Sequence, residues 1–382
     1  MRTVRIPLSK RLPRQRMRRW GIVLSAMLMS SILLAACGES SPSILNPQGP
    51  VANQESNLFW FILIVATIVF VIVEGLLIYS IVRFRERPNM PLPRQVHGNN
   101  TLEIAWTIGP SLFLFAVLVA TIYTMFNLGN ISNNSPIGQL EIRVVGHQWW
   151  WEFDYTNTNP QIVTADELVV PQGTLIHTLL KSDNVIHSFW VPQVMGKTDV
   201  VPGHNNDKLF RADTPGTYRG LCTEYCGLNH AHMSFNLIVM KTSDYMTWLS
   251  GQEKAAQTPT DPAAVAGMKL FTGSGGCFAC HGIVGVNLNS YTDPKAAGLV
   301  GPNLTHFGSR RIIAGEVLEW SPQSCQVVTD SSGNASIKNP DGCGLYQWLK
   351  DPRGIKPEND MVIRQLSPTE IAQLIAYLES LT

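Results

Sequence analysis

Two long apolar stretches dominate the first third of the chain, at residues 58–82 and 104–126. Each exceeds the roughly 20 apolar residues that an α-helix needs to cross about 30 Å of hydrocarbon. The loop between them carries several basic residues and a single acid, namely Arg83, Arg85, Arg87, Arg94 and Glu86. Because arginine-rich loops stay in the cytoplasm, the pattern predicts a two-helix transmembrane hairpin over residues 58–126 with both ends outside.

A different pattern follows the hairpin. From residue 139 to about residue 245, short stretches of alternating polar and apolar residues are separated by turns that contain proline and glycine. Many short strands with such turns predict a β-sandwich or a small barrel. A polar linker is expected over residues 246–261, and a helical pattern continues over residues 262–382. Its closing helix, Pro368 to Leu381, is preceded by Ser367 and carries Glu370, which together form a capping box.

The N-terminus has the pattern of an export signal. Eight basic residues and no acids lie in residues 1–36, and the apolar run there ends in small residues. This is typical of a secretory signal. Leu34-Ala35-Ala36-Cys37 further resembles a bacterial lipoprotein signal, which is cleaved before a cysteine that becomes lipidated. Residues 37–57 would then be a polar tether. The alternative is an uncleaved signal anchor in which Cys37 is incidental.

Composition and charge exclude several classes of protein. Charged residues make up 15% of the 382 residues and hydrophobic residues 45%. These values disfavour a disordered protein, a nucleic-acid binder and a purely soluble enzyme. The formal net charge is +1, but without the eight N-terminal basic residues, 21 basic residues face 28 acidic ones, a net charge of −7. The exported part is therefore acidic, and we expect no nucleic-acid partner.

The densest group of potential ligands is Cys222-Thr223-Glu224-Tyr225-Cys226, followed by His230, His232 and Met233. Thiolate and thioether sulfurs are soft ligands that select copper over hard cations. Two thiolates four residues apart can bridge a pair of copper ions, and His187, on a neighbouring predicted strand, can supply a second imidazole. The alternative is a Cys222–Cys226 disulfide, which leaves the histidine and methionine spacing unexplained. The spacing alone leaves the choice between His230 and His232 open.

A second motif lies in the helical region. Cys277-Phe278-Ala279-Cys280-His281 is the attachment signature of c-type haem, in which two thiols add to the vinyl groups and the histidine binds the iron. A zinc or redox Cys-x-x-Cys site is the alternative, but zinc would need a second ligand pair. The sixth ligand should be soft if the haem potential is high. Met361 is the preferred candidate, whereas Met268 is better explained by core packing.

The hairpin, the β region and the copper motif together resemble subunit II of the haem–copper cytochrome c oxidases. The resemblance implies a cupredoxin-like Greek-key β-barrel over residues 139–245 that holds the dinuclear copper centre Cu-A. Cys222 and Cys226 match the residues that bridge the coppers, and His187 and His230 each match a ligand of one copper. Met233 and the backbone carbonyl of Glu224 complete the implied ligand set, from which His232 is excluded.

The same resemblance implies roles for three further side chains. Trp149, in Gly146-His147-Gln148-Trp149-Trp150-Trp151, matches the residue that receives electrons, although a place in the barrel core would explain it equally well. Glu103 matches the carboxylate at the mouth of a proton channel. The Glu224 side chain would help to hold a magnesium ion shared with subunit I. His204 departs from the family pattern, since many relatives have an arginine there.

The C-terminal region resembles the class I cytochrome c domain that is fused to subunit II in caa(3)-type oxidases. The resemblance rests on Gly301-Pro302-Asn303-Leu304-Thr305, Trp348-Leu349-Lys350-Asp351-Pro352 and the stretch Lys356 to Met361. It implies an all-α domain over residues 262–382, with haem c on Cys277 and Cys280 and with His281 and Met361 as axial ligands. Many relatives have Met-Pro where this chain has Met361-Val362.

These features predict the electron-transfer subunit of a proton-translocating cytochrome c oxidase in a bacterial cell membrane, with its copper and haem domains on the outer face. Electrons would pass from haem c to Cu-A and on to subunit I, which reduces oxygen to water. The expected partners are subunit I, other oxidase subunits and an external donor: cytochrome c, a small copper protein or an upstream complex. The alternatives are a Cu-A-containing nitric oxide reductase subunit and a copper-storage or assembly lipoprotein. A quinol oxidase is disfavoured because it typically lacks the two copper-binding cysteines.

Two cysteines, Cys325 and Cys343, have no part in these motifs. They bracket residues 326–342, a polar segment without periodicity that looks like an insertion. Because the region is expected outside the membrane, a disulfide across the base of this segment is predicted. The alternatives are two free thiols or a third metal site, for which the segment offers no histidine.

Net charge bears on how the two exported regions interact. Residues 139–245 carry a net charge of −4 and residues 246–382 a net charge of −2. Because the signs are equal, the sequence predicts that electrostatic attraction does not hold the two regions together.

Overall fold

The computed structural model describes residues 42–86, 97–129, 140–330 and 334–382, together with Ser25, Met29 and Gln95. Apart from Ser25 and Met29, the predicted signal segment lies outside this part of the chain, as do the Cys37 lipidation site and Arg87 and Arg94 of the basic loop.

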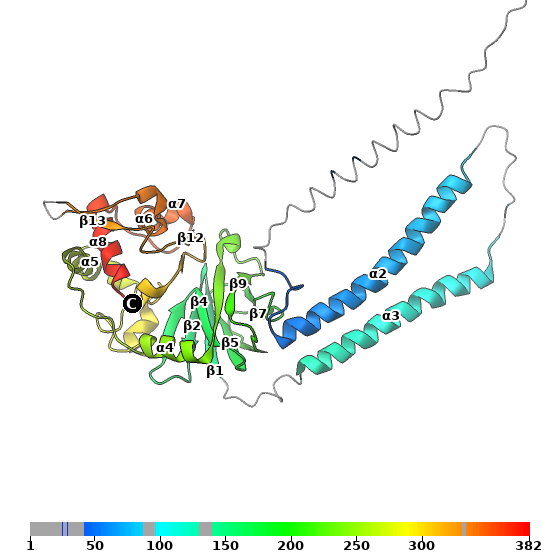
Figure 1. The fold of residues 1–382 in the computed structure, drawn as a ribbon, viewed down its shortest axis with the longest axis horizontal. Helices are drawn as coiled ribbons and strands as arrows, with labels where there is room; N and C mark the ends of the chain where they lie inside the picture. The colour runs from blue at the N-terminus through cyan, green and yellow to red at the C-terminus, as the bar shows by residue number, and fades with distance from the viewer. Residues whose placement is uncertain are drawn as a thin grey trace, which may run out of the picture. The chain divides into compact units, whose positions relative to one another are not determined.

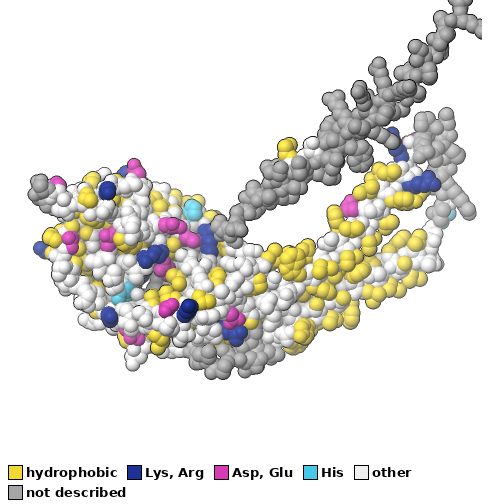
Figure 2. All heavy atoms as spheres, in the orientation of Figure 1, with side chains coloured by type: hydrophobic (Ala, Val, Ile, Leu, Met, Phe, Trp, Pro, Cys, Tyr) yellow, Lys and Arg dark blue, Asp and Glu magenta, His cyan; other side chains and the backbone are white. Residues whose placement is uncertain are grey.

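Two long helices, α2 (Pro50–Arg83) and α3 (Asn100–Gly129), form the predicted hairpin (Figure 1). Both are long and apolar enough to cross a membrane, and their most apolar stretches are not buried against protein. Figure 2 shows hydrophobic side chains along both helices.

Helix α2 begins at Pro50, inside the region expected to be a tether, because its first turn packs on the β region. Val51, Ala52 and Ser56 are buried there, and the Ala52 amide donates to the Val194 carbonyl at 3.4 Å. Proline is also favoured at the first helical position.

The β region is a sandwich of two five-stranded sheets, as predicted. The first sheet has the order β3-β2-β1-β5-β8 and the second the order β4-β10-β9-β6-β7. Strands β1 and β5 pair in parallel, as do β4 and β10, and the other pairs are antiparallel. The strands are β1 Leu140–His147, β2 Trp150–Tyr155, β3 Ile162–Ala165, β4 Glu167–Pro171, β5 Ile176–Ser182, β6 His187–Trp190, β7 Thr198–Val200, β8 Asn206–Phe210, β9 Gly216–Cys222 and β10 Ser234–Met240.

Aromatic side chains fill the space between the two sheets. Phe189 and Phe235, from the second sheet, stack at 4.7 Å between ring centroids, and Trp151, from the first, meets both edge-on. All three are fully buried. Burial of this much apolar area is the main stabilising contribution to the sandwich, and it fixes the strand ends that carry the site described below.

Helix α4 (Thr242–Gln252) follows the last strand, so the linker predicted over residues 246–261 is helical at its start. The sequence there looks polar, but one face of α4 packs on the sandwich. Trp248 lies 5.5 Å from Tyr155 and 5.6 Å from Tyr245, measured between ring centroids.

The C-terminal region, residues 262–382, has a core of its own. Its helices are α5 Pro262–Thr272, α6 Gly344–Lys350, α7 Pro352–Ile355 and α8 Pro368–Glu379, with 3₁₀ turns at Cys277–Ala279, Pro294–Gly298, Phe307–Ser309 and Pro340–Gly342. Gly267 lets α5 and α8 approach closely, since a β carbon there would lie 1.9 Å from the Gln373 carbonyl oxygen. The capping box of Ser367 and Glu370 is present at the start of α8.

Two short hairpins interrupt this helical region, so the all-α prediction is wrong in that detail. Ile312–Ile313 (β11) pairs with Leu318–Glu319 (β12), and Val327–Thr329 (β13) pairs with Ala335–Ile337 (β14). The second hairpin lies in the segment that looked like a loop without periodicity. Its strands were not predicted because three residues are too few to show alternation.

Cys325 and Cys343 form a disulfide at the base of the β13–β14 hairpin, with both side chains fully buried. Replacing both by alanine should lower the free energy of unfolding of this region by about 3 kcal/mol, because the unfolded chain loses a loop constraint. Thermal unfolding measured by calorimetry checks this value. Peptide mass spectrometry without reduction is the companion measurement, and recovery of both cysteines in alkylated form would contradict the bridge.

Candidate metal and redox centres

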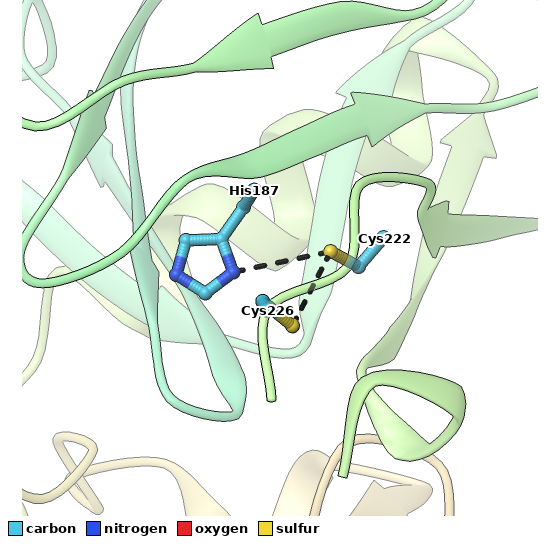
Figure 3. Close-up of side chains that lie close together, drawn as sticks. All are labelled: His187, Cys222 and Cys226. Carbon is cyan, nitrogen blue, oxygen red and sulfur yellow. Dashed lines mark hydrogen bonds between the residues drawn. The ribbon is translucent and has the colours of Figure 1, made fainter. Parts of the chain in front are cut away.

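Four potential ligand side chains meet beside Cys222, the last residue of β9: Cys226, His230 and Met233 come from the loop that follows β9, and His187 comes from β6. The Cys222 sulfur lies 3.7 Å from the Cys226 sulfur and 3.9 Å from His187 Nδ1. The Cys226 sulfur lies 3.6 Å from His230 Nδ1 and 3.8 Å from the Met233 sulfur. Figure 3 shows the His187 ring and both thiols converging. The arrangement offers two central sulfurs with one imidazole on either side.

The backbone explains why these groups meet. Strands β6 and β9 are paired, with Phe189 opposite Cys222, so His187 projects from the adjacent strand into the same site. The loop after β9 is closed by the Cys222 amide, which donates to the Met233 carbonyl at 3.0 Å, and by the Thr223 amide, which donates to Ser188 at 3.0 Å. Gly227 turns the loop with a φ of 116°, a conformation that favours glycine.

The structure separates His230 from His232. Both lie in a 3₁₀ turn, His230–His232, and not in an extended strand that would point them the same way. His230 faces Cys226, whereas His232 is exposed. Cys222 and Cys226 are free thiols in the structure, so the alternative of a disulfide between them is not what the fold adopts.

The two thiols shift each other's pKa because they are in contact. The contact with Cys226 lowers the pKa of Cys222 to about 3, and the same contact raises the pKa of Cys226. A thiolate at neutral pH is the form that binds metal. The carbonyl oxygen of Glu224, 3.3 Å from the Cys222 sulfur, adds one hard donor to a soft ligand set that suits copper.

Trp149 is attached to this site. Its side chain is 5% exposed, and its Nε1 donates to the Cys226 carbonyl at 3.0 Å. The side-chain amide of Gln148 donates to the same carbonyl at 2.7 Å. Trp149 and Trp151 both belong to the buried core of the sandwich, as the alternative interpretation expected. Trp149 also contacts the cysteine loop through its hydrogen bond to Cys226.

A cavity of about 410 Å³ lies beside the Cys-x-x-Cys-His motif. Cys277, Cys280, His281 and Met361 line it from the C-terminal region, and His147, Trp149 and Trp150 line it from the sandwich. Its volume is in the range of cofactor sites. Met268 and Met361 both pack against the core of the C-terminal region, but of the two only Met361 lines the cavity, which favours it as the methionine that faces a ligand.

His281 is held in a ligand-ready orientation. Its Nδ1 lies 2.9 Å from the Pro302 carbonyl, so this nitrogen carries the proton and Nε2 is left to bind a metal. Burial lowers the pKa of His281, which keeps the ring neutral. Gly301 makes room for the ring, since a β carbon there would lie 2.6 Å from its Cε1 atom.

The structure gives positions for the remaining predicted residues, Glu103, Glu224 and His204. Glu103 lies in the first turn of α3, where a carboxylate interacts favourably with the helix dipole. The side chain of Glu224 is half-buried, and His204 is exposed in a turn. Their suggested roles stay predictions.

No sequence pattern predicts that Lys356 is buried, yet its side chain is 3% exposed at the contact between the C-terminal region and the sandwich. Its Nζ donates to the carbonyls of Trp149 and Ala314, and burial lowers its pKa to about 8. Asp166, also buried, opposes that shift. A lysine in a polar loop ordinarily indicates a solvated position, so no sequence signal could have identified it.

The prediction from net charge is wrong at this contact. Arg219 of β9 pairs with Glu316 of the C-terminal region, and Lys356 lies near Asp166. Individual charges of opposite sign meet although both regions are acidic overall, because a contact is decided by neighbouring charges and distant ones are screened.

Two family models match this chain. Residues 45–123 match the transmembrane domain of cytochrome c oxidase subunit II, and residues 158–242 match its periplasmic domain. Cytochrome c oxidase subunit 2 of Alkalihalophilus pseudofirmus is 33% identical over 356 residues, which covers 92% of this chain and 94% of that protein. The chain belongs to the cytochrome c oxidase subunit II family.

Other members show the breadth of the subunit II family. Subunit 2 of Bacillus subtilis is 30% identical over 378 residues, covering 95% of this chain and 98% of that one. Quinol oxidase subunit 2 of Bacillus cereus is 30% identical over 277 residues, covering 72% and 92%. The crystal structure of the periplasmic domain of subunit II of cytochrome oxidase of Bradyrhizobium japonicum is 28% identical with a TM-score of 0.29, and covers 31% of this chain and 96% of that one.

Membership in the subunit II family makes this protein a membrane-bound electron-transfer subunit of a haem–copper oxidase, which it forms with subunit I. The sandwich is the cupredoxin-like periplasmic domain, which in this family normally holds Cu-A. Within the part of the chain that the structure describes, His187, Cys222 and Cys226 lie close enough together to hold a metal ion in that domain.

Proposed function

We propose that this subunit carries its own haem c and passes electrons from it to Cu-A and then to subunit I, where oxygen is reduced to water with proton pumping. The observation that carries the proposal is the cavity that Cys277, Cys280, His281 and Met361 share with Trp149. Trp149 in turn donates a hydrogen bond to the backbone of Cys226. An electron donor bound in this cavity would therefore lie next to the proposed copper site.

In the copper site, Cys222 and Cys226 would bridge two coppers, with His187 and His230 as terminal ligands on opposite sides. In the order His187, Cys222, Cys226 and His230, the ligand atoms of each consecutive pair lie within 4 Å of each other. The Met233 thioether and the Glu224 carbonyl would complete the two coordination spheres. Such a pair would supply one-electron transfer with little rearrangement, because these side chains already lie close together.

In the cavity, Cys277 and Cys280 would bind haem covalently, and His281 and Met361 would be its axial ligands. The Pro302 carbonyl orients His281, and the Met361 amide donates to the Asn359 side chain at 2.8 Å, which holds the methionine loop. A thioether ligand raises the potential of a haem. These residues therefore favour a cytochrome c domain over a zinc or thiol redox site.

The other assignments rest on the resemblance to subunit II and, for Cys37, on the resemblance to a lipoprotein signal. The copper and haem domains would lie on the outer face of a bacterial cell membrane, with Cys37 lipidated after signal cleavage. Glu224 would help to hold magnesium at the boundary with subunit I, Glu103 would stand at a proton-channel mouth, and Trp149 would pass electrons to Cu-A. The external donor would be a cytochrome c, a small copper protein or an upstream complex.

Metal and optical analysis of the purified full-length subunit tests the proposal. We expect two coppers with a mixed-valence spectrum and one haem that stays attached after acid–acetone extraction. Zinc in place of copper, or haem that is extracted, would contradict it. Labile, substoichiometric copper would favour a copper-storage or assembly protein.

The purified complex decides between the oxidase alternatives. We expect it to consume oxygen with reduced cytochrome c as the donor. Consumption of nitric oxide instead would indicate a nitric oxide reductase. Quinol oxidation is the relevant rival because Bacillus cereus quinol oxidase subunit 2 is a relative, but the two copper-site cysteines argue against it.

A further inference from the structure

The backbone of one loop of the C-terminal region forms hydrogen bonds with two carboxylates and one backbone amide of the sandwich. We call this loop, Arg311–Glu316, the docking loop. The Glu167 carboxylate accepts from the amides of Arg311 at 2.7 Å and Ile312 at 3.3 Å. Asp166 accepts from the Gly315 amide at 3.0 Å, and the Gly315 carbonyl accepts from the Ser234 amide at 3.1 Å. Each of these bonds joins the two regions.

The conformation of the docking loop depends on this contact. Ala314, Gly315 and Glu316 have φ values of 56°, 69° and 68°, three left-handed residues in a row. Non-glycine residues adopt that conformation only where their surroundings stabilise it. At Gly315 a β carbon would lie 2.5 Å from the His232 carbonyl oxygen and 3.1 Å from that of Trp149. Only glycine fits between the loop and the copper-site backbone.

Lys356 reinforces the same contact. It is 3% exposed, and its Nζ donates to the Trp149 carbonyl and, at 2.8 Å, to the Ala314 carbonyl. A buried ammonium is costly unless it is hydrogen-bonded and near an opposite charge, which Asp166 supplies. Trp149 in turn donates a hydrogen bond to the Cys226 carbonyl, so two hydrogen bonds and Trp149 connect Lys356 with the cysteine loop. Lys356 and Met361 line the same cavity.

We propose that the docking loop and Lys356 hold the C-terminal domain in one fixed position on the copper domain, and that Lys356 is a positioning residue for electron transfer between the two centres. The positioning role rests on the proposed haem c. In the transfer one electron leaves ferrous haem, which becomes ferric, and reduces the mixed-valence copper pair by one electron. No atom or proton moves. The fused domain thus acts as a docked donor and not as a mobile one on a tether.

Two variants of the full-length protein test this: Gly315→Val, which blocks the close approach, and Lys356→Met, which keeps the chain length and removes the charge. Lys350→Met is the matched control, because Lys350 lies on the same domain and is exposed. Hydrogen–deuterium exchange of residues 311–316 should rise at least tenfold in both variants and stay unchanged in the control. If Gly315→Val does not fold, Lys356→Met decides alone.

The second measurement is the rate of transfer from haem to Cu-A after flash reduction of the haem. It should fall at least tenfold in both variants, while the haem potential and the copper spectrum stay as in the natural protein. A variant that disturbed the structure of either centre would instead shift the haem potential or the copper spectrum. Unchanged exchange would overturn the docking, and raised exchange with an unchanged transfer rate would overturn the positioning role.

The outcomes separate this inference from the proposed function. A natural protein without covalent haem would overturn the haem assignment and the positioning role with it. The exchange measurement needs no haem, so it would still decide whether the two domains are docked.

Discussion

Cys226→Ser should abolish the mixed-valence copper signal of this subunit while haem stays attached. Cys226 stands between Cys222 and His230, with its sulfur 3.7 Å and 3.6 Å from their ligand atoms. A hydroxyl is a hard, weakly acidic donor that cannot replace a bridging thiolate, so the two metals would lose their common ligand. Electron paramagnetic resonance of the purified variant measures the loss, and haem staining after denaturing electrophoresis measures the attachment.

Thr223→Ser is the matched control for the copper variant. It lies in the same loop, and the backbone amide that holds the loop to Ser188 is retained. Its copper spectrum should equal that of the natural protein. An intact dinuclear spectrum in Cys226→Ser would mean that the ligand assignment is wrong.

Met361→Ala should lower the haem potential and slow electron transfer towards copper. Met361 faces the cavity next to the Cys-x-x-Cys-His motif, and loss of a thioether ligand stabilises ferric haem. Axial ligands set haem potentials over a range of roughly 0.8 V, so the shift should be large on that scale. Redox titration followed in the visible spectrum measures it. The haem should remain bound through Cys277 and Cys280.

Met268→Ala controls for the loss of a methionine from the same domain. Met268 packs against the domain core, so its removal should reduce stability and leave the potential close to its natural value. The reverse result, a shifted potential in Met268→Ala and none in Met361→Ala, would transfer the ligand assignment to Met268.

Local patterns predicted much of this protein from its sequence. Two apolar stretches above membrane-spanning length, alternation between Pro–Gly turns, and the capping box of Ser367 and Glu370 each depend on neighbouring residues. The hairpin, the sandwich and the start of α8 therefore appear in the structure as expected. The candidate ligands in the cysteine loop are similarly local, since Cys222 to Met233 lie in one connection between β9 and β10.

Boundaries and short elements were predicted less well. Helix α2 starts early and α4 replaces part of the expected linker because each packs against the sandwich, a contact that no local pattern records. The three-residue strands β13 and β14 are too short for a periodic signal. The choice between His230 and His232 needed the 3₁₀ turn, which the spacing did not reveal.

The membrane hairpin, the β-sandwich and the two cysteine motifs could be predicted from the amino-acid sequence, because each is encoded by residues close together in the chain. The connection between the two motifs depends on contacts between distant residues, which appear only in the folded protein. Lys356 lies 207 positions from Trp149, and Glu167 lies 144 positions from Arg311. Net charges of equal sign predicted no attraction between the two regions. At their contact, however, the buried carboxylates of Asp166 and Glu167 accept hydrogen bonds from backbone amides, and the buried Lys356 donates hydrogen bonds to backbone carbonyls. Such pairings depend on distance in space and on burial, which residue types and spacing do not specify.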